Sequence, residues 1–408
     1  MNIAKILTVI TLFGCMGSCA WVIARNLETA APVPTQFSNA YPVPEDVGER
    51  VYPTYFLRRA WVQITRDLAK TEVPPTMPLD LDTLSRQEFA VAWLGHAAML
   101  MRVGDLWVLI DPALSETAGP IQGLGPKRLT PLPIAIDALP HIDVVLISHD
   151  HYDHLDLDTV KRLAQQSGGE PRYLVGRGLG KWFEGNVRVS ASEFDWWDSL
   201  RIGDTDFHFV PAQHNSGRTP FRKNTHLWGG WVVGHAGKRF YFPGDTAYVK
   251  QLFEDIRERA GPIDVAALPI GAYQPRRLMR YEHMNPDDAV NAHLALNAQT
   301  SFGVHWGTFQ LGDEELFEPA RDLATAMKQH DLSSGFGLMP IGGFITIDTT
   351  TRHTLLAPDQ LRPARALNSG NSAADDSRFR LWRPVRHASP PSPPIPASPD
   401  PSPDVLHR

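Results

Sequence analysis

The chain has only two cysteines among its 408 residues, Cys15 and Cys19. Both lie in an apolar N-terminal stretch, so a processed body would contain no thiol to form a disulfide, to ligate zinc or to attack a substrate. An excess of basic residues is also absent, because the formal net charge is −6 at pH 7. A chain without a global positive field is not expected to have nucleic acid as its main partner.

The N-terminal residues 1–26 form the longest apolar stretch of the sequence, and they predict an export signal. Within them, Leu12-Phe13-Gly14-Cys15 resembles a bacterial lipobox, which would leave Cys15 as a lipidated first residue. The alternative is an uncleaved membrane anchor, because the apolar run from 6 to 24 is about long enough to cross a bilayer. Either interpretation predicts a protein of the cell envelope, attached to a membrane surface, with its body outside the cytoplasm.

The remainder divides into three segments. Residues 27–85 are rich in proline around one helical pattern at 55–68, and we expect this N-terminal extension to pack on a catalytic body. Residues 86–350 form the predicted catalytic domain. The tail, 351–408, is rich in serine and proline from about residue 368. Such a composition cannot bury a core, which predicts disorder in that part.

The predicted catalytic domain alternates short apolar runs with helical patterns. Gly, Pro and Asp bound the runs, which predict strands at 89–93, 99–103, 107–110, 143–147, 207–210, 230–233, 239–242, 265–269, 302–304 and 344–347. Helices are predicted at 157–166, 249–259 and 286–296. Strands that first follow one another and then alternate with helices indicate a layered α/β fold.

Four potential metal ligands stand within six residues directly after the strand predicted at 143–147. They are His149, His151, Asp153 and His154, in an H-x-H-x-D-H pattern. A loop that follows a strand end can direct several imidazoles into one cavity, as a catalytic metal requires. We expect the first two to hold one ion and the last two a second, and we count Asp153 among the catalytic residues as well.

Three further ligands are expected where later strands end. His214, Asp245 and His305 each follow an apolar run, and Asp245 could bridge two ions. Two ions about 3.5–4 Å apart lower the pKa of a shared water and neutralise the group under attack. We predict two Zn²⁺ per chain, although nitrogen and carboxylate ligands also suit manganese or iron.

This series of ligands resembles the metallo-β-lactamase superfamily. Within it, several stretches look like the N-acyl-phosphatidylethanolamine-hydrolysing phospholipase D family, namely WLGHA, PAQH, LWGGW, GDT, GAYQP, HMNP and VHWGTF. The resemblance covers residues from about 50 to about 350. It implies an αβ/βα sandwich with the metals at one edge, and hydrolysis of a lipid phosphodiester to phosphatidic acid and an N-acylethanolamine.

In the resembling family, the loop containing Tyr273 and His283 lies over the metals. The two side chains are therefore catalytic candidates that would orient a phosphate or stabilise charge on its oxygens, with packing as the alternative. Arg276, Arg277 and Arg280 are predicted to bind the substrate, because a guanidinium group matches phosphate, although they could equally form a solvated surface.

The sequence leaves several residue roles, the substrate and the oligomeric state open. His96 is expected to support the ligands rather than bind metal, and His226 competes with His214 as a ligand. Arg218, Arg222 and Lys223 are weaker candidates for contact with a head group. The substrate could instead be a lactone or another ester, or the chain could be a non-catalytic envelope protein. The sequence also leaves open whether the chain forms a homodimer.

Overall fold

The computed structural model describes residues 36–42, 70–219, 222–347 and 354–366. The predicted signal segment, the helix predicted at 55–68 and the serine- and proline-rich part of the tail lie outside these ranges. Within the described ranges, no helix combines the length and the apolar character that crossing a bilayer requires.

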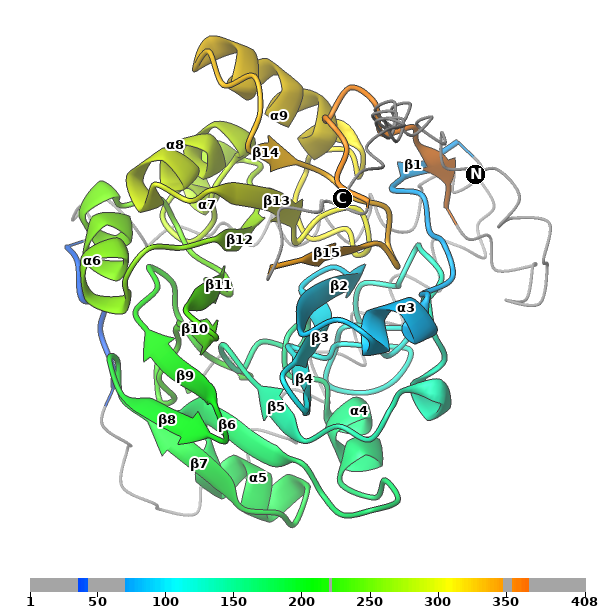
Figure 1. Ribbon diagram of the computed structural model, residues 1–408, viewed down its shortest axis with the longest axis vertical. Coiled ribbons are helices and arrows are strands. Elements are labelled where there is room, and N and C mark those ends of the chain that lie inside the picture. Colours follow the sequence, from blue (N-terminus) through cyan, green and yellow to red (C-terminus); the bar gives the residue numbers. More distant parts are fainter. Residues whose placement is uncertain (1–35, 43–69, 220–221, 348–353, 367–408) are drawn as a thin grey trace, which may run out of the picture.

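Two seven-stranded sheets form the centre of the structure (Figure 1). The first has the order β15-β2-β3-β4-β5-β6-β7. Its strands are β2 (Phe89–Gly95), β3 (Ala98–Val103), β4 (Leu106–Ile110), β5 (Val144–Leu146), β6 (Arg172–Gly176), β7 (Ala191–Phe194) and β15 (Phe344–Thr346).

The second sheet has the order β14-β13-β12-β11-β10-β9-β8. Its strands are β8 (Ser199–Ile202), β9 (Thr205–Val210), β10 (Gly230–His235), β11 (Lys238–Phe242), β12 (Val265–Pro269), β13 (Thr300–Val304) and β14 (Phe336–Gly337). A separate pair joins β1 (Glu72–Val73) to β16 (Ala364–Arg365) in antiparallel register.

Helices cover the outer face of each sheet (Figure 1). On the first sheet lie α3 (Leu81–Ser85), α4 (Leu157–Leu163) and α5 (Gly180–Asn186). On the second lie α6 (Lys250–Ala260), α8 (Pro286–Leu296) and α9 (Glu318–Gln329), and the one-turn helix α7 (Arg276–Met279) precedes α8. The order helices, sheet, sheet, helices confirms the predicted αβ/βα sandwich.

The side chains of β2 show how the sequence builds these layers. Phe89, Val91 and Trp93 belong to the core between the sheets, whereas the intervening alanines and Leu94 pack toward α4 and α5. Successive residues of a strand point to opposite faces, so a strand that is apolar at every position is buried on both.

The sequence did not predict β6, β7 or β8. The reason is clearest for β7 and β8, which form the outer edges of the two sheets and carry exposed polar residues such as Glu193 and Arg201. An edge strand with polar side chains lacks the apolar run by which the other strands are recognised.

The strand directions place the predicted ligands at one edge. β4, β5 and β6 are parallel, as are β11, β12 and β13, and β9 runs in the same direction as β11 because each is antiparallel to β10. The loops that follow β5, β9, β11 and β13 therefore leave their sheets at the carboxyl edge, where ligands bind in open α/β sheets.

Candidate metal centre

The first group of possible ligands comprises His149, His151, His214 and Asp245. The Nε2 atom of His149 lies 2.9 Å from the Nδ1 atom of His151, which lies 3.2 Å from the Nε2 atom of His214. His149 and His214 are buried, whereas His151 is partly exposed. Three imidazole nitrogens that converge on one point match the donor set of a divalent transition metal.

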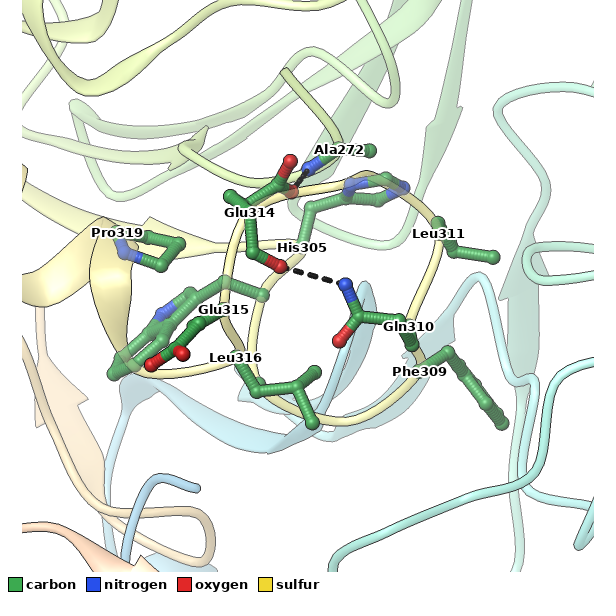
Figure 2. A pocket seen from close by; sticks show the side chains of 11 residues that line it. Ala272, His305, Phe309, Gln310, Leu311, Glu314, Glu315, Leu316 and Pro319 are labelled. Carbon is green, nitrogen blue, oxygen red and sulfur yellow. Dashed lines mark hydrogen bonds between the residues drawn. The ribbon is translucent and has the colours of Figure 1, made fainter. Parts of the chain in front are cut away.

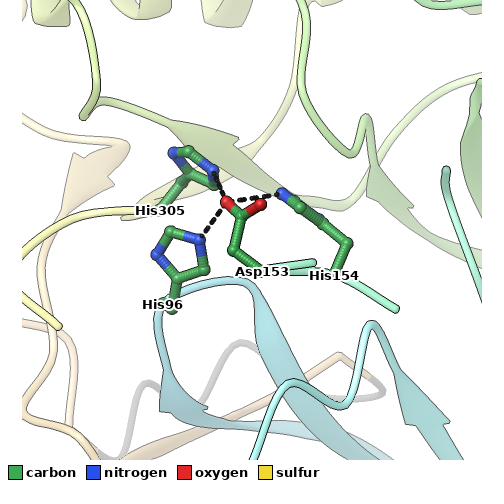
Figure 3. A group of neighbouring side chains, drawn as sticks. All are labelled: His96, Asp153, His154 and His305. Atoms are coloured by element: carbon green, nitrogen blue, oxygen red, sulfur yellow. Dashed lines mark hydrogen bonds and ion pairs between the residues drawn. The ribbon is translucent and has the colours of Figure 1, made fainter. Parts of the chain in front are cut away.

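The second group surrounds the carboxylate of Asp153 (Figure 3). Its Oδ2 atom lies 3.5 Å from Nε2 of His154 and 3.4 Å from Nε2 of His305. It also accepts a hydrogen bond of 2.9 Å from Nε2 of His96. His96 thus lies within this group of possible ligands, and its supporting role stays a prediction.

Asp245 lies between the two groups. Its Oδ2 atom is 3.9 Å from Nε2 of His149 and 3.7 Å from Nε2 of His214. On the other side, it is 3.3 Å from Nε2 of His154, and Oδ1 is 2.9 Å from Nε2 of His305. The structure therefore brings all seven predicted ligands together, with the carboxylate of Asp245 within reach of both groups.

Hydrogen bonds on the outer side orient three of the imidazoles. The Nδ1–H of His154 donates to Asp111 at 2.7 Å, and that of His214 donates to the carbonyl oxygen of Glu282 at 2.9 Å. Ser148 gives its hydroxyl proton to Asp111, so Oγ accepts from Nδ1–H of His149. In the neutral form each ring turns an unprotonated Nε2 inward, which is the tautomer that a metal binds. Burial keeps the pKa of His149 and His214 low, whereas Asp245, Asp153 and Asp111 outweigh burial at His154 and raise its pKa, so there a metal ion would replace a proton.

The charge balance also favours cations. Burial, followed by the neighbouring imidazoles, holds the pKa of His149 well below its usual value. Burial opposes the charge of His305 too, but Asp245 and Asp153 outweigh it and raise its pKa to about 9. The carboxylates thus hold a positive charge next to imidazoles that stay neutral, and a divalent ion would supply that charge.

Three buried polar atoms of the two ligand groups have no hydrogen-bond partner in the described part of the chain. Nε2 of His154, Nε2 of His305 and Oδ1 of Asp245 are inaccessible to solvent, and none has a hydrogen bond of acceptable geometry to any described residue. Leaving such atoms unsatisfied is costly, and metal coordination is one way of satisfying all three. The residues present therefore fit a metal centre.

Unusual backbone conformations direct several of these side chains. His96, Asp111 and His305 have φ angles of 53°, 41° and 61°, in the left-handed region that side chains other than glycine rarely adopt. Each follows the end of a strand, where such strain typically marks a functional site. Gly244, before Asp245, has φ 67°, and a Cβ there would lie 2.6 Å from that of Ser148.

The loop between β12 and α8 contributes His283 but not Tyr273. Nδ1 of His283 lies 3.8 Å from Oδ2 of Asp245, and its ring lies 5.7 Å from that of His305. The hydroxyl of Tyr273 instead donates to Asp322 on α9 at 2.7 Å. Its only proton is therefore committed within the protein, and the geometry gives no support to a catalytic role for Tyr273.

The predicted substrate-binding arginines differ from one another. Arg276 donates to Asp288 at 2.6 Å and to the carbonyl oxygen of His283 at 2.9 Å, so its guanidinium group fastens the loop instead of facing substrate. Arg277 and Arg280 are exposed, and Arg280 stacks on Tyr281 at 4.5 Å. Contact of these two with substrate stays a prediction.

Two further candidates, His226 and Arg218, contact the H-x-H-x-D-H loop and are not among the possible metal ligands. Nδ1 of His226 lies 2.8 Å from Asp150, so His214 and not its rival belongs to the ligand group. Arg218 donates to the carbonyl oxygens of Asp150 and Leu155 at 2.7 and 2.8 Å. Sequence reasoning missed Asp111, although it stands, like the predicted ligands, directly after a strand.

The loop after β13 encloses a small cavity beside His305 (Figure 2). Gln310 donates to the carbonyl oxygen of Glu314 at 2.6 Å, and the Glu314 carboxylate accepts from the backbone N–H groups of Ala272 and Gln274. The cavity that this loop encloses beside His305 measures about 10 Å³. That volume holds about one water molecule, so substrate cannot enter there.

A larger cavity borders the H-x-H-x-D-H loop at Tyr152. We name it the loop cavity; it has a volume of about 740 Å³. Its wall includes Tyr152, which stands between His151 and Asp153. The wall also includes the basic and aromatic residues Arg177, Lys181, Trp182, Arg218 and Arg222.

Comparison with known proteins agrees with this geometry. Residues 106–306 match the Beta-lactamase superfamily domain. The chain is 37% identical over 277 residues to N-acyl-phosphatidylethanolamine-hydrolyzing phospholipase D 1 of Caenorhabditis elegans, covering 65% of this chain and 76% of that protein. It is 30% identical to a UPF0173 metal-dependent hydrolase of Ligilactobacillus salivarius, covering 58% and 94%. The crystal structure of a possible metal-dependent hydrolase from Veillonella parvula superposes with a TM-score of 0.50 at 17% identity, covering 64% and 100%.

Proposed function

The chain belongs to the metallo-β-lactamase superfamily as a metal-dependent hydrolase, and we propose that it is a zinc phosphodiesterase of the phospholipase D type. The substrate would be an N-acyl phosphatidylethanolamine-like lipid, and the products phosphatidic acid and an N-acylethanolamine. The observation that carries the hydrolytic part is the shared position of Asp245 between two groups of imidazoles. The similarity to the C. elegans enzyme supports the choice of substrate.

In this proposal, His149, His151 and His214 would hold one ion and Asp153, His154 and His305 would hold the second, with Asp245 within reach of both. When bound, two divalent ions lower the pKa of a water molecule and neutralise charge on phosphoryl oxygens. The chain's own contribution is to hold the imidazoles as neutral tautomers and to leave the site open on one side. His151 and Asp153 are the partly exposed members, so substrate would approach from there.

His283 is the side chain best placed to act on the substrate without being one of the seven ligands. It is largely buried, and burial lowers its pKa to about 4, so the imidazole is neutral near pH 7. Its Nδ1 atom has no hydrogen-bond partner among the described residues. A neutral imidazole can donate an N–H to a phosphoryl oxygen, or accept a proton, and one such donor is typically worth about 10²–10³ in rate.

The loop cavity, whose wall includes none of the seven ligand candidates, could hold part of a large lipid outside the metal centre. Its volume of about 740 Å³ lies within the usual range for sites that bury a large ligand. Aromatic and cationic side chains in its wall suit a molecule with both apolar and anionic parts. A small neutral lactone would leave most of this surface in contact with water.

The test uses purified full-length protein of known metal content. It would be assayed with an N-acyl phosphatidylethanolamine, a simple phosphodiester and a panel of lactones, in water enriched in ¹⁸O. We expect hydrolysis of the lipid, with the label in phosphatidic acid because water attacks phosphorus. Label in the N-acylethanolamine, or faster turnover of a lactone, would contradict the proposed reaction.

Variants test the metal assignment in the same assay. We expect about two equivalents of metal in the wild-type protein, and loss of turnover in His151→Ala and Asp245→Ala. His330→Ala is the matched control. This imidazole stands at the end of α9, contacts Asp287 of α8 and lies in neither ligand group. Full activity of a metal-free preparation would exclude the metal mechanism.

A further inference from the structure

One turn of the described chain displays large apolar side chains to solvent. Only three such side chains are exposed among the described residues: Ile121 at 63%, Leu294 at 47% and Leu124 at 40%. Ile121 and Leu124 share the turn 119–125, which we name the apolar turn. The N–H of Leu124 donates to the carbonyl oxygen of Ile121 at 3.0 Å, so the turn is formed although its side chains are not covered.

The apolar turn adjoins the loop cavity, because Pro120 is part of the cavity wall. Four cationic side chains line that wall, although the whole chain has a net charge of −6. Arg177 is paired with Asp195 at 2.6 Å. Glu193, the carboxylate of the wall, accepts from the backbone N–H groups of Gly178 and Gly180. These backbone bonds leave the charge of Glu193 in place, so the wall sets three further cations against one carboxylate and stays positive on balance.

Aromatic rings hold one of these cations in place. The guanidinium carbon of Arg218 lies 4.0 Å from the centre of the Tyr152 ring and 5.0 Å from that of Trp182. Tyrosine and tryptophan beside basic groups are typical of surfaces that meet the head-group region of a bilayer. Tyr152 stands in the chain between two of the ligand candidates, His151 and Asp153, although the wall of the loop cavity includes none of the seven.

We propose that the apolar turn and the loop cavity form one docking face for a bilayer that contains anionic phospholipids. Ile121 and Leu124 enter the boundary between head groups and acyl chains, while Lys181 and Arg222 contact lipid phosphates. The combination of apolar and basic residues on one face is what interfacial binding requires. The identity of the lipid that then reaches His151 rests on the proposed function, whereas docking itself needs no turnover.

The experiment measures partition of the full-length protein onto two kinds of vesicle, one of phosphatidylcholine and one of phosphatidylcholine mixed with phosphatidic acid. The ratio of the two partition coefficients cancels any contribution of the N-terminal segment that does not depend on lipid charge. Lys181→Glu combined with Arg222→Glu should lower this ratio by about 30-fold or more, given the usual contribution of each basic residue near an anionic surface.

Removing the apolar side chains should have a different signature. Ile121→Ser combined with Leu124→Ser should lower partition onto both vesicles by about tenfold or more, because apolar burial does not depend on lipid charge. The matched controls are Leu294→Ser, the third exposed apolar side chain, and Lys328→Glu on α9. Both controls should bind as the wild type does.

Two results would overturn the docking face. One is an unchanged vesicle ratio in the charge-reversal variant. The other is inhibition of hydrolysis by glycerol phosphate without any preference for anionic vesicles, which would assign the cavity to a soluble phosphate. Because partition is measured without turnover, failure of the docking face is distinguishable from failure of the proposed reaction.

Discussion

Replacement of Asp111 by asparagine should weaken metal binding without removing any ligand. Asp111 is fully buried, and its carboxylate accepts from three donors: the N–H of Ser148 at 2.7 Å, the Ser148 hydroxyl, and Nδ1–H of His154 at 2.7 Å. An asparagine has one carbonyl oxygen, and in either orientation its NH₂ group faces a donor. If it faces His154, that imidazole loses the acceptor that fixes its tautomer.

The magnitude follows from two independent estimates. A hydrogen bond to a charged group contributes about 1.5–3 kcal/mol. Changes to the partners of metal ligands typically cost about 10–100-fold in metal affinity, which equals about 1.4–2.7 kcal/mol. Both estimates predict a Kd for the metal that is roughly one to two orders of magnitude higher in Asp111→Asn than in the wild type.

The assay is competition with a chromophoric chelator, with metal content measured after dialysis. Asp264→Asn is the matched control, because Asp264 is also largely buried but accepts from Lys238 and from the backbone of Arg239, away from the ligands. The control should lose stability and keep its metal affinity. A folded Asp111→Asn protein with wild-type affinity would refute the argument that Asp111 orients His154 for a metal.

Two further predictions concern pH and the loop. Burial lowers the pKa of His293 to about 4, below the unfolded value near 6.5, so its contribution to stability is complete above pH 6.5 and is lost as the pH falls toward 4. The free energy of unfolding in urea should fall between pH 7 and pH 5 by about 2 kcal/mol less in His293→Gln than in the wild type. An equal fall in both proteins would contradict this prediction. Arg276→Ala should lower kcat by about 10–100-fold, because His283 would be displaced. Arg277→Ala should mainly raise KM for anionic lipids. Steady-state kinetics that show the same change in KM for both variants would contradict this distinction.

The convergence of the seven ligand candidates could be predicted because each of them is local to a recognisable strand. β5, β9, β11 and β13 are apolar runs, and a His or Asp follows each of them within a few residues. Strand direction then brings distant loops to one edge, which periodicity and polarity suffice to indicate. Asp111 also follows an apolar strand, β4, directly. The rule that a polar residue after such a strand marks the site would therefore have found it.

The roles of Tyr273 and Arg276 could not be predicted, because their partners are not marked in the sequence. Asp322 lies on α9, far along the chain from Tyr273, and only the packing of α9 against α8 brings it near. Asp288 lies closer, but it is also a residue of the α8 capping box, and nothing in the sequence indicates that it binds an arginine. Left-handed φ angles at His96 and His305 have no sequence signal either.

The extension and the tail illustrate a further limit of dividing a sequence by composition. The boundary at 85/86 follows the proline-rich extension and that at 350/351 follows the last predicted strand, yet β1 of the extension pairs with β16 of the tail. Asn39, also in the extension, accepts from the backbone N–H of His214 and from the indole of Trp228, each at 3.1 Å. A segment that composition separates from the catalytic body thus positions one of its ligand candidates, because backbone pairing and single hydrogen bonds leave no compositional trace.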